Sequence, residues 1–422
     1  MEYEHLSKSY EYGLSKIYEM VINNNPCYAY LMEGNSELDQ KLVMAHVYGH
    51  CDFFKNNVWF KHTDRKMIDT MGNHATRIKR YMDKYGVEVV EGFIDHVLSL
   101  ENLIDRYNPE QMPTDLYKVT VVNEPLILKS SSSYMDPFIN PKDKTRGERE
   151  ERVDFVPQKD VLKFLMDHAP LSDWQADVIS ILRKEAYYYS PQGMTKTLNE
   201  GWASYWHSKI LTEHILSDSE AFEFADKHSG VMAMAPNGYN PYKIGIELLR
   251  DIEERWNRGQ FGKDWEQCDD IQEKKHWDKK TGKGREKIFE VRKVLSDVAF
   301  IDQYLTKDFC LKHGFYVYKL DKKTNRFVVD TSDFEAIKQM LLFKMTNFGQ
   351  PLISIVHNNF ENRGELLLDH LHEGMDLQPD FMAETMKSLF VIWKRPIHLM
   401  TKMQEQVMMY SYDTSGLKSK KI

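Results

Sequence analysis

The chain has 422 residues, of which 42% are hydrophobic and 12% aromatic, and its formal net charge is −8 at pH 7. This length and composition predict a folded protein of two or three domains and exclude a disordered or fibrous chain. The modest negative charge argues against a general binder of nucleic acid or of anionic membranes, because such proteins carry basic surfaces.

The sequence also bears on the cellular compartment. It contains no run of about 18 apolar residues, as a membrane-spanning helix would require, and its first residues lack the basic start and apolar core of a signal peptide. The four cysteines, Cys27, Cys51, Cys268 and Cys310, form no C-x-x-C pair and predict neither a disulfide framework nor a thiolate zinc site. We therefore expect a cytoplasmic protein whose cysteines are small buried hydrophobic residues.

The first hundred residues predict four helices. Apolar side chains recur at spacings of three and four over residues 6–21, as on one face of a helix. Ser36, followed three residues later by Asp39, resembles a capping box and opens the second helix. The same periodicity predicts further helices over 67–81 and 89–104.

The pattern breaks over residues 107–157. Five prolines between residues 109 and 141, four consecutive serines and a long charged run predict a loop or insertion, interrupted by a short strand over 117–122. Helical patterns then resume at Asp160.

The next part of the chain predicts three helices, over 172–189, 198–216 and 241–256. Residues 259–285 are rich in charge and glycine, which favours a solvated loop.

After Phe309 the pattern changes again. GFYVYKLD and RFVVDT predict two strands joined by a polar turn, and LISIVHNNF and GELLLDHLHE predict two more. Helices are expected over 333–345 and in PDFMAETMKSLFVIWK.

Together these patterns predict a mainly α protein with a smaller C-terminal α+β domain. We expect a helical region over 1–107, a loop or insertion over 108–157, a second helical region over 158–308 that forms one core with the first, and the α+β domain over 309–422.

Two histidines, His46 and His50 in the segment HVYGH, lie on the predicted second helix. At this spacing both imidazoles project from one helix face, about one turn apart, within reach of a single metal ion. Neutral imidazoles bind zinc in helical sites of this kind. The alternative is a pair of ordinary histidines on a half-buried helix, and the spacing alone does not decide between the two.

A carboxylate on a later predicted helix could complete such a site. Glu200 lies in LNEGWASYWH beside a glycine and an alanine, and small residues allow one helix to approach another closely. LNEGWA resembles the Asn-Glu-Gly-aromatic-Ala segment of gluzincin aminopeptidases, and this resemblance implies a gluzincin-like core in which Glu200 is the third zinc ligand. The alternative is a solvated glutamate beside an aromatic core stripe.

The chain departs from that pattern at the general base. The metallopeptidase motif H-E-x-x-H carries a glutamate at its second position, where this chain has Val47, which cannot accept a proton. Either the base comes from elsewhere or the site is not a peptidase. Glu185, in RKEAYYY, is the best alternative base or fourth ligand, although an exposed helical glutamate is the ordinary interpretation.

Other residues are candidates for supporting roles. His207 lies seven residues after Glu200, about 10.5 Å along the helix, so both cannot bind one ion, and we expect it to support a ligand or face the substrate. Tyr239 and Tyr242 could donate phenol hydrogen bonds to a developing oxyanion, or could belong to a turn before a helix. His74, on an apolar stripe, is expected to be a hydrogen-bonded core residue.

Four long segments carry a resemblance to a known family: MEYEHLSKSYEYGLSKIYEMVINNNPCYAYLME, AHVYGHCDFFKNN, EAYYYSPQGMTKTLNEGWASYWHSKI and NPYKIGIELLRDIEERW. They make most of the chain similar to the SpoVR family (stage V sporulation protein R). The resemblance implies a bacterial cytoplasmic protein linked to spore cortex formation, or to stationary-phase or stress physiology outside spore formers. It also implies two partners, an AAA+ serine-kinase-like protein and a von Willebrand A-like protein.

The resemblance has a departure of its own. Family members usually carry a segment before the region where this chain begins, including a His-Trp-x-x-Gly-like stretch that this sequence lacks. We therefore expect a shortened chain or a member of a short branch. The family name describes a phenotype, so the resemblance implies no reaction.

Two functional hypotheses follow. In the first, His46, His50 and Glu200 hold zinc, or another divalent metal, in a hydrolase of amide bonds; zinc lowers the pKa of its water to roughly 7, which partly offsets a poorly placed base. In the second, the protein is a non-catalytic scaffold that works with the AAA+ partner. The missing glutamate of H-E-x-x-H favours the scaffold, whereas the concentration of polar residues near two motifs favours the hydrolase. A helical iron site would require Glu-x-x-His on one helix, which neither histidine-bearing motif helix shows.

Overall fold

The structure is a computed structural model, and the residues that it describes are 20–107, 157–234, 238–321 and 324–422. These residues divide into two compact units. The first unit contains the described parts of Met1–Val90 and Lys184–Gln350, and the second those of Glu91–Arg183 and Pro351–Ile422. The four consecutive segments expected as domains stay a prediction.

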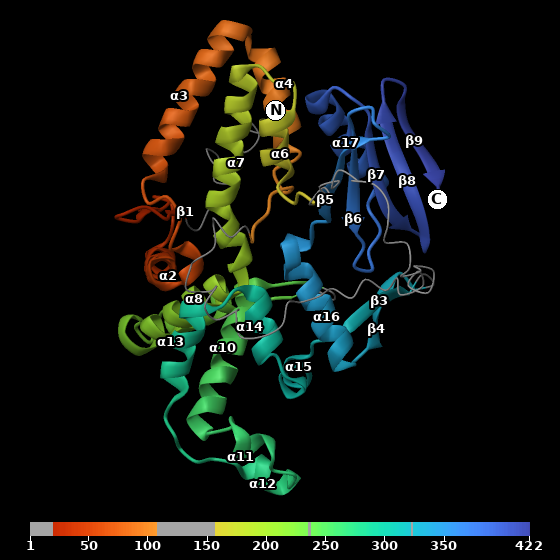
Figure 1. The fold of residues 1–422 in the computed structure, drawn as a ribbon. Coiled ribbons are helices and arrows are strands. Elements are labelled where there is room, and N and C mark those ends of the chain that lie inside the picture. Colours follow the sequence, from red (N-terminus) through yellow and green to blue (C-terminus); the bar gives the residue numbers. More distant parts are fainter. Residues whose placement is uncertain (1–19, 108–156, 235–237, 322–323) are drawn as a thin grey trace, which may run out of the picture. The chain divides into compact units, whose positions relative to one another are not determined.

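The first unit is mostly helical (Figure 1). Its N-terminal elements are β1 (Met20–Ile22), β2 (Tyr28–Tyr30), α2 (Glu37–Asn56), the 3-10 helix η1 (Val58–Phe60) and α3 (Met67–Tyr85). Its central elements are α8 (Lys196–Ile210), the π-helix η3 (Leu211–Ile215), α9 (Ala221–Val231), α10 (Pro241–Arg258), α11 (Lys263–Glu266), α12 (Ile271–His276) and α13 (Gly284–Val294). Its last elements are α14 (Asp297–Tyr304), α15 (Lys307–His313), β3 (Val317–Asp321), β4 (Arg326–Thr331), α16 (Phe334–Met345) and η4 (Thr346–Gly349).

The core of the first unit is built around α8, which packs against α2 on one side and α10 on another. Phe53 of α2, Leu198 and Trp202 of α8 and Ile244 of α10 are all fully buried in one hydrophobic cluster. Burying such large apolar side chains supplies most of the stability of the unit. The core therefore brings together, around α8, helices that are far apart in the sequence.

The second unit combines helices with a five-stranded sheet in the order β5-β6-β7-β8-β9. Its elements are α6 (Val161–His168), β5 (Leu352–Phe360), β6 (Glu365–Leu371), α17 (Pro379–Trp393), β7 (Ile397–Met403), β8 (Gln406–Asp413) and β9 (Gly416–Lys421). Strands β6 and β7 are parallel and are connected by α17, whereas the other neighbours are antiparallel. A parallel pair needs such a crossover connection, and α17 packs on the sheet that it connects (Figure 1). Two helices, α4 (Val87–Leu98) and α7 (Asp173–Met194), have residues in both units.

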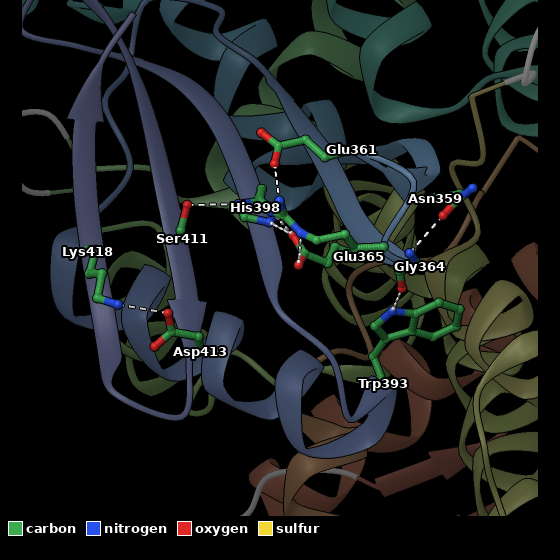
Figure 2. A network of polar contacts seen from close by, with 10 residues as sticks. Asn359, Glu361, Gly364, Glu365, Trp393, His398, Ser411, Asp413 and Lys418 are labelled. Carbon is green, nitrogen blue, oxygen red and sulfur yellow. Dashed lines mark hydrogen bonds and ion pairs between the residues drawn. The ribbon is translucent and has the colours of Figure 1, made fainter.

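A polar network joins three strands of this sheet, as Figure 2 shows. His398 of β7 contacts Glu365 of β6 through Nε2, at 2.7 Å, and Ser411 of β8 through Nδ1, at 2.8 Å. Arg363 binds the same carboxylate with two N–H groups, at 2.6 and 2.9 Å. We call Arg363, Glu365, His398 and Ser411 the sheet cluster. Its buried carboxylate is satisfied by a permanent cation and an imidazole.

Many predicted elements are confirmed. Ser36 is the N-cap of α2 and accepts a hydrogen bond from the backbone N–H of Asp39. The helix predicted over 67–81 lies within α3, and the strand pair GFYVYKLD and RFVVDT corresponds to β3 and β4. The prediction of a mainly α protein with a sheet-containing C-terminal part is also confirmed.

Other predictions were wrong. Val21, placed at the end of a helix over 6–21, belongs to β1, because its backbone pairs with Ala29 of β2; residues 6–19 and the strand expected over 117–122 lie outside the described residues. The loop expected over 259–285 contains two short helices, α11 and α12, the second of which is capped by Asp270. Strands β7, β8 and β9 were not predicted at all.

None of the helices in the described part of the chain combines the length and the apolar character that crossing a bilayer requires.

Candidate functional site

Helix α2 positions the two histidines of HVYGH. Because Ser36 starts the helix and it continues unbroken to Asn56, His46 and His50 project from one face one turn apart. Both side chains are buried, and their ring centroids lie 4.7 Å apart in an edge-to-face arrangement. The local sequence of α2 is therefore sufficient to place two of the three candidate ligands, His46 and His50, on one helix face.

Helix α8 brings the carboxylate, and small residues make its approach to both neighbours possible. A Cβ atom added at Gly49 of α2 would lie 2.6 Å from the Cα of Ala203, and one added at Gly201 would lie 2.4 Å from the backbone of Gly245 in α10. The prediction that small residues allow a close helix approach is confirmed. Any larger side chain at these positions would push α8 away from its neighbours.

The carboxylate of Glu200 faces both imidazoles. Its Oε2 atom lies 3.4 Å from Nε2 of His46 and 3.5 Å from Nε2 of His50. One ligand atom from each of the three residues lies within 4.8 Å of the others. We call His46, His50 and Glu200 the helical cluster. Two histidines and a glutamate are the protein ligands of several catalytic zinc sites.

The opposite ring nitrogen of each histidine is held by a neighbour. His50 Nδ1 lies 2.9 Å from Oδ1 of Asn199, an oxygen that can only accept, so this ring nitrogen carries the proton. His46 Nδ1 lies 2.8 Å from Nδ1 of His207, whose Nε2 lies 3.2 Å from Nδ1 of His228. If His46 donates to His207, then His207 donates to His228, and both ring nitrogens of His207 are satisfied.

The electrostatics of the site differ between its members. Burial raises the pKa of the Glu200 carboxyl, but hydrogen bonds from His46 and His50 outweigh burial and hold that pKa well below its usual range. Burial and the neighbouring imidazoles of His46 and His228 lower the pKa of His207 well below its usual value. At neutral pH the site therefore presents an ionised carboxylate, while His207 is uncharged.

The start of α8 is anchored by a buried carboxyl group. The backbone N–H groups of Thr197 and Leu198 donate to Asp297, at 2.7 and 2.8 Å. Burial raises the pKa of Asp297 to about 7, although these backbone hydrogen bonds act in the opposite direction. Further along the helix, Trp202 donates its indole N–H to Asp52 of α2 at 2.9 Å. These contacts fix the position of α8 along its axis and against α2.

The remaining predicted residues lie in different surroundings. Glu185 contacts His74 at 2.9 Å, and among the described residues it does not join the helical cluster. His74 is buried, so its prediction as a hydrogen-bonded core residue is confirmed. Tyr239 is in hydrogen-bond contact with Thr197, and burial raises the pKa of its phenol.

Tyr242, at the start of α10, is the tyrosine whose ring contacts the helical cluster. It stacks on His46 with ring centroids 6.0 Å apart. Val47, in the position of the H-E-x-x-H glutamate, is buried and offers no base. The phenol of Tyr242 is therefore a better candidate for contact with a substrate than that of Tyr239.

Three residues that hold the site were not predicted from the sequence: Asn199, His228 and Asp297. Asn199 precedes Glu200 in the LNEGWA segment, so the resemblance carried by that segment could have indicated it. His228 and Asp297 carry no local signal, because they lie 21 residues from His207 and 100 residues from Thr197.

Comparisons with known proteins place these motifs in a family. A family model described as "SpoVR like protein" matches residues 1–350. The chain is 36% identical over 276 residues to the Escherichia coli (strain K12) protein named "Uncharacterized protein YcgB". The matched region covers 60% of this chain and 52% of that relative. The chain thus spans about half the length of the curated relative that it matches. No solved structure matches, so the gluzincin-like core stays a prediction.

Proposed function

The chain belongs to the SpoVR family, and we propose that it is a metal-dependent hydrolase of amide bonds whose zinc ion is held by His46, His50 and Glu200. One observation carries the proposal. Two imidazole Nε2 atoms face a single carboxylate oxygen, while the Nδ1 atoms of both rings are occupied elsewhere. A metal-binding histidine usually donates its second ring N–H in this way.

The spacing of the ligand atoms fits zinc. Two ligands that each lie about 2.0–2.1 Å from a tetrahedral zinc ion are about 3.3–3.4 Å apart. The Glu200 oxygen lies 3.4 and 3.5 Å from the two Nε2 atoms, which is close to that separation. The three side chains would therefore need little rearrangement to bind the ion.

The protonation of the rings supports the same proposal. Because Nδ1 of His50 carries a proton, its Nε2 contacts the Glu200 carboxylate as a donor when the ring is protonated, or through a bound cation when the ring is neutral. Two electron-rich atoms at this separation repel each other unless a cation, either a proton or a metal ion, lies between them. A divalent metal ion satisfies both histidines and the carboxylate at once.

The protein's own residues would divide the work around the metal. Asn199 and His207 orient the two imidazoles, and Asp297 and Trp202 hold the helix that carries Glu200. Zinc in such a site polarises a carbonyl group and lowers the pKa of a water molecule to about 7. We assign to Tyr242 the stabilisation of negative charge on the carbonyl oxygen of the substrate.

The first test is the metal content of the purified full chain. After loading with zinc and removal of unbound metal, we expect about one zinc per chain. Glu200→Gln preserves the size of the side chain but removes its charge, so zinc content should fall while circular dichroism stays unchanged. His74→Ala serves as the control, because it removes a buried histidine outside the helical cluster. A chain that binds no zinc, cobalt or manganese would overturn the proposal and favour the scaffold hypothesis.

The second test is hydrolysis. The zinc-loaded chain should generate new amino termini in a mixed peptide library, and Glu200→Gln should abolish this. If hydrolysis survives complete removal of metal by a chelator, then the cleavage of amide bonds does not depend on the metal site, which would contradict the proposal.

A further inference from the structure

Two cysteines that are far apart in the sequence lie close together, one in the β1–β2 hairpin and the other in α2. Cys27 lies between β1 and β2, directly before Tyr28, and Cys51 follows His50 in α2. The two thiols are in hydrogen-bond contact, and both residues are only partly buried. The expectation that the cysteines are small buried hydrophobic residues is therefore wrong for this pair, and also for Cys268, which is only partly buried.

The contact is held by the surrounding fold. Arg65 donates to the carbonyl oxygen of Phe54 at 2.7 Å and also to the side chain of Asn23 in the hairpin. The backbone N–H of Asn25 donates to the carbonyl oxygen of Arg65 at 3.0 Å, and Asn23 donates to Thr63 at 3.2 Å. The hairpin that carries Cys27 is thus tied to the segment that follows α2, which keeps the two sulfur atoms together.

The surroundings also activate one thiol of the pair. The hydrogen bond from Cys51 holds the pKa of Cys27 below its usual value despite the opposing effect of burial, and the positive charge of Arg65 contributes. A lowered thiol pKa increases the fraction of thiolate at neutral pH, and the thiolate is the nucleophilic form.

The other two cysteines provide an internal contrast. Cys310 is buried, and burial raises the pKa of its thiol to about 11. The thiol of Cys268 donates to the carboxylate of Glu273 at 3.8 Å and to the carbonyl oxygen of Asp270 at 3.7 Å.

We propose that Cys27 and Cys51 form a peroxide-sensitive modification site that closes to a reversible disulfide bond. The Cys27 thiolate attacks one oxygen of hydrogen peroxide, the O–O bond breaks, and the departing hydroxide takes up a proton to become water. The Cys51 sulfur then attacks the resulting sulfenic acid, the S–O bond breaks, and a second water leaves with the Cys51 proton. Two thiols are oxidised to one disulfide while one peroxide is reduced to two waters. The site uses no ligand of the helical cluster and stands independently of the proposed function.

The test is thiol mapping of the full chain after treatment with hydrogen peroxide. Two of the four thiols should become inaccessible to N-ethylmaleimide, and the chain mass should fall by about 2 Da for the loss of two hydrogens. Digestion should yield one cross-linked pair of peptides that contains Cys27 and Cys51, and dithiothreitol should restore all four thiols. Cys268→Ser and Cys310→Ser, as matched controls, should each leave this cross-link unchanged.

A variant of the resolving thiol separates the two steps. In Cys51→Ser, peroxide should convert Cys27 to a sulfenic acid that dimedone traps, and no intramolecular cross-link should form. The serine hydroxyl is nearly the same size as the thiol and can still donate a hydrogen bond, so the fold should survive. Two results would overturn the proposal: oxidation that begins at Cys268 or Cys310, and a peroxide-treated wild-type chain in which Cys27 and Cys51 both stay accessible to N-ethylmaleimide.

Discussion

Two buried clusters of this molecule pair histidine with glutamate, and they differ in how the carboxylate charge is balanced. In the sheet cluster, His398 contacts Glu365 at 2.7 Å, and Arg363 supplies a permanent positive charge through two hydrogen bonds. In the helical cluster, the groups that lower the pKa of Glu200 are two imidazoles, His46 and His50.

The comparison shows how the same residue types produce different chemistry. The sheet cluster is complete, because its arginine satisfies the carboxylate without any added ion. The helical cluster presents a carboxylate and two ring nitrogens at wider spacing, each imidazole being held from its far side. The sheet cluster is therefore a structural ion pair, whereas the helical cluster has the ligand set of a candidate metal site.

The largest expected effect is on metal binding. The double variant His46→Ala/His50→Ala should lower zinc content from about one per chain to less than about a tenth, because one carboxylate alone holds zinc poorly. His398→Ala should leave zinc content unchanged, although it removes a histidine from the sheet cluster. Elemental analysis of both variants measures the difference. If both variants lost zinc equally, the helical cluster would not be the specific metal site that we propose.

The next effect concerns the reaction. Tyr242→Phe should lower kcat by about 10²–10³-fold, as expected for loss of one hydrogen-bond donor to an oxyanion, while zinc content stays the same. Tyr239→Phe is the matched control, since the phenol of Tyr239 is in hydrogen-bond contact with Thr197, whereas the ring of Tyr242 stacks on His46. If kcat falls further in Tyr239→Phe than in Tyr242→Phe, then Tyr239 and not Tyr242 donates the hydrogen bond to the oxyanion.

A smaller effect tests how tightly the helical cluster depends on helix packing. Gly201→Ala should reduce the free energy of unfolding by about 1–3 kcal/mol, because the new Cβ would meet the backbone of Gly245. Gly72→Ala has no atom within 4 Å of its new Cβ and should be neutral, or stabilising by up to about 1 kcal/mol. Urea denaturation compares the two. Equal stability of both variants would show that α8 can move away from α10 without cost.

The smallest effect is the pH dependence contributed by Asp297. Its folded-state pKa is raised by burial to about 7, so the folded state binds an extra proton between the ordinary carboxyl pKa and about 7. The wild-type protein should therefore gain up to about 1.4 kcal/mol per pH unit relative to Asp297→Asn as pH falls from 7 to 5. Denaturant titrations at pH 5, 6 and 7 measure this slope, and parallel stability curves would contradict it.

The sequence predicts the parts of this account that depend on local spacing. The capping residue Ser36 and the four-residue separation of His46 and His50 were sufficient to place both imidazoles on one helix face. The small residue at Gly201 correctly indicated a close helix approach. The family resemblance, which was carried by long motifs, is also confirmed.

The sequence did not indicate which residues that are far apart in the chain contact one another. Nothing near His207 indicates that it lies between His46 and His228 rather than among substrate contacts. Val21 follows helical spacing, yet pairing with the neighbouring strand places it in a hairpin. Cys27 and Cys51 become a pair only because that hairpin docks beside α2.

X-ray absorption spectroscopy of the zinc-loaded full chain tests most directly whether a metal ion binds between the two imidazoles and the carboxylate of the helical cluster. We expect a coordination shell of only nitrogen and oxygen atoms at about 2.0–2.2 Å, with scattering from two imidazole rings. Glu200→Gln should change this shell, whereas Cys27→Ser should not. Sulfur atoms at about 2.3 Å would contradict the account, because they would place the metal on cysteine thiolates instead of the helical cluster.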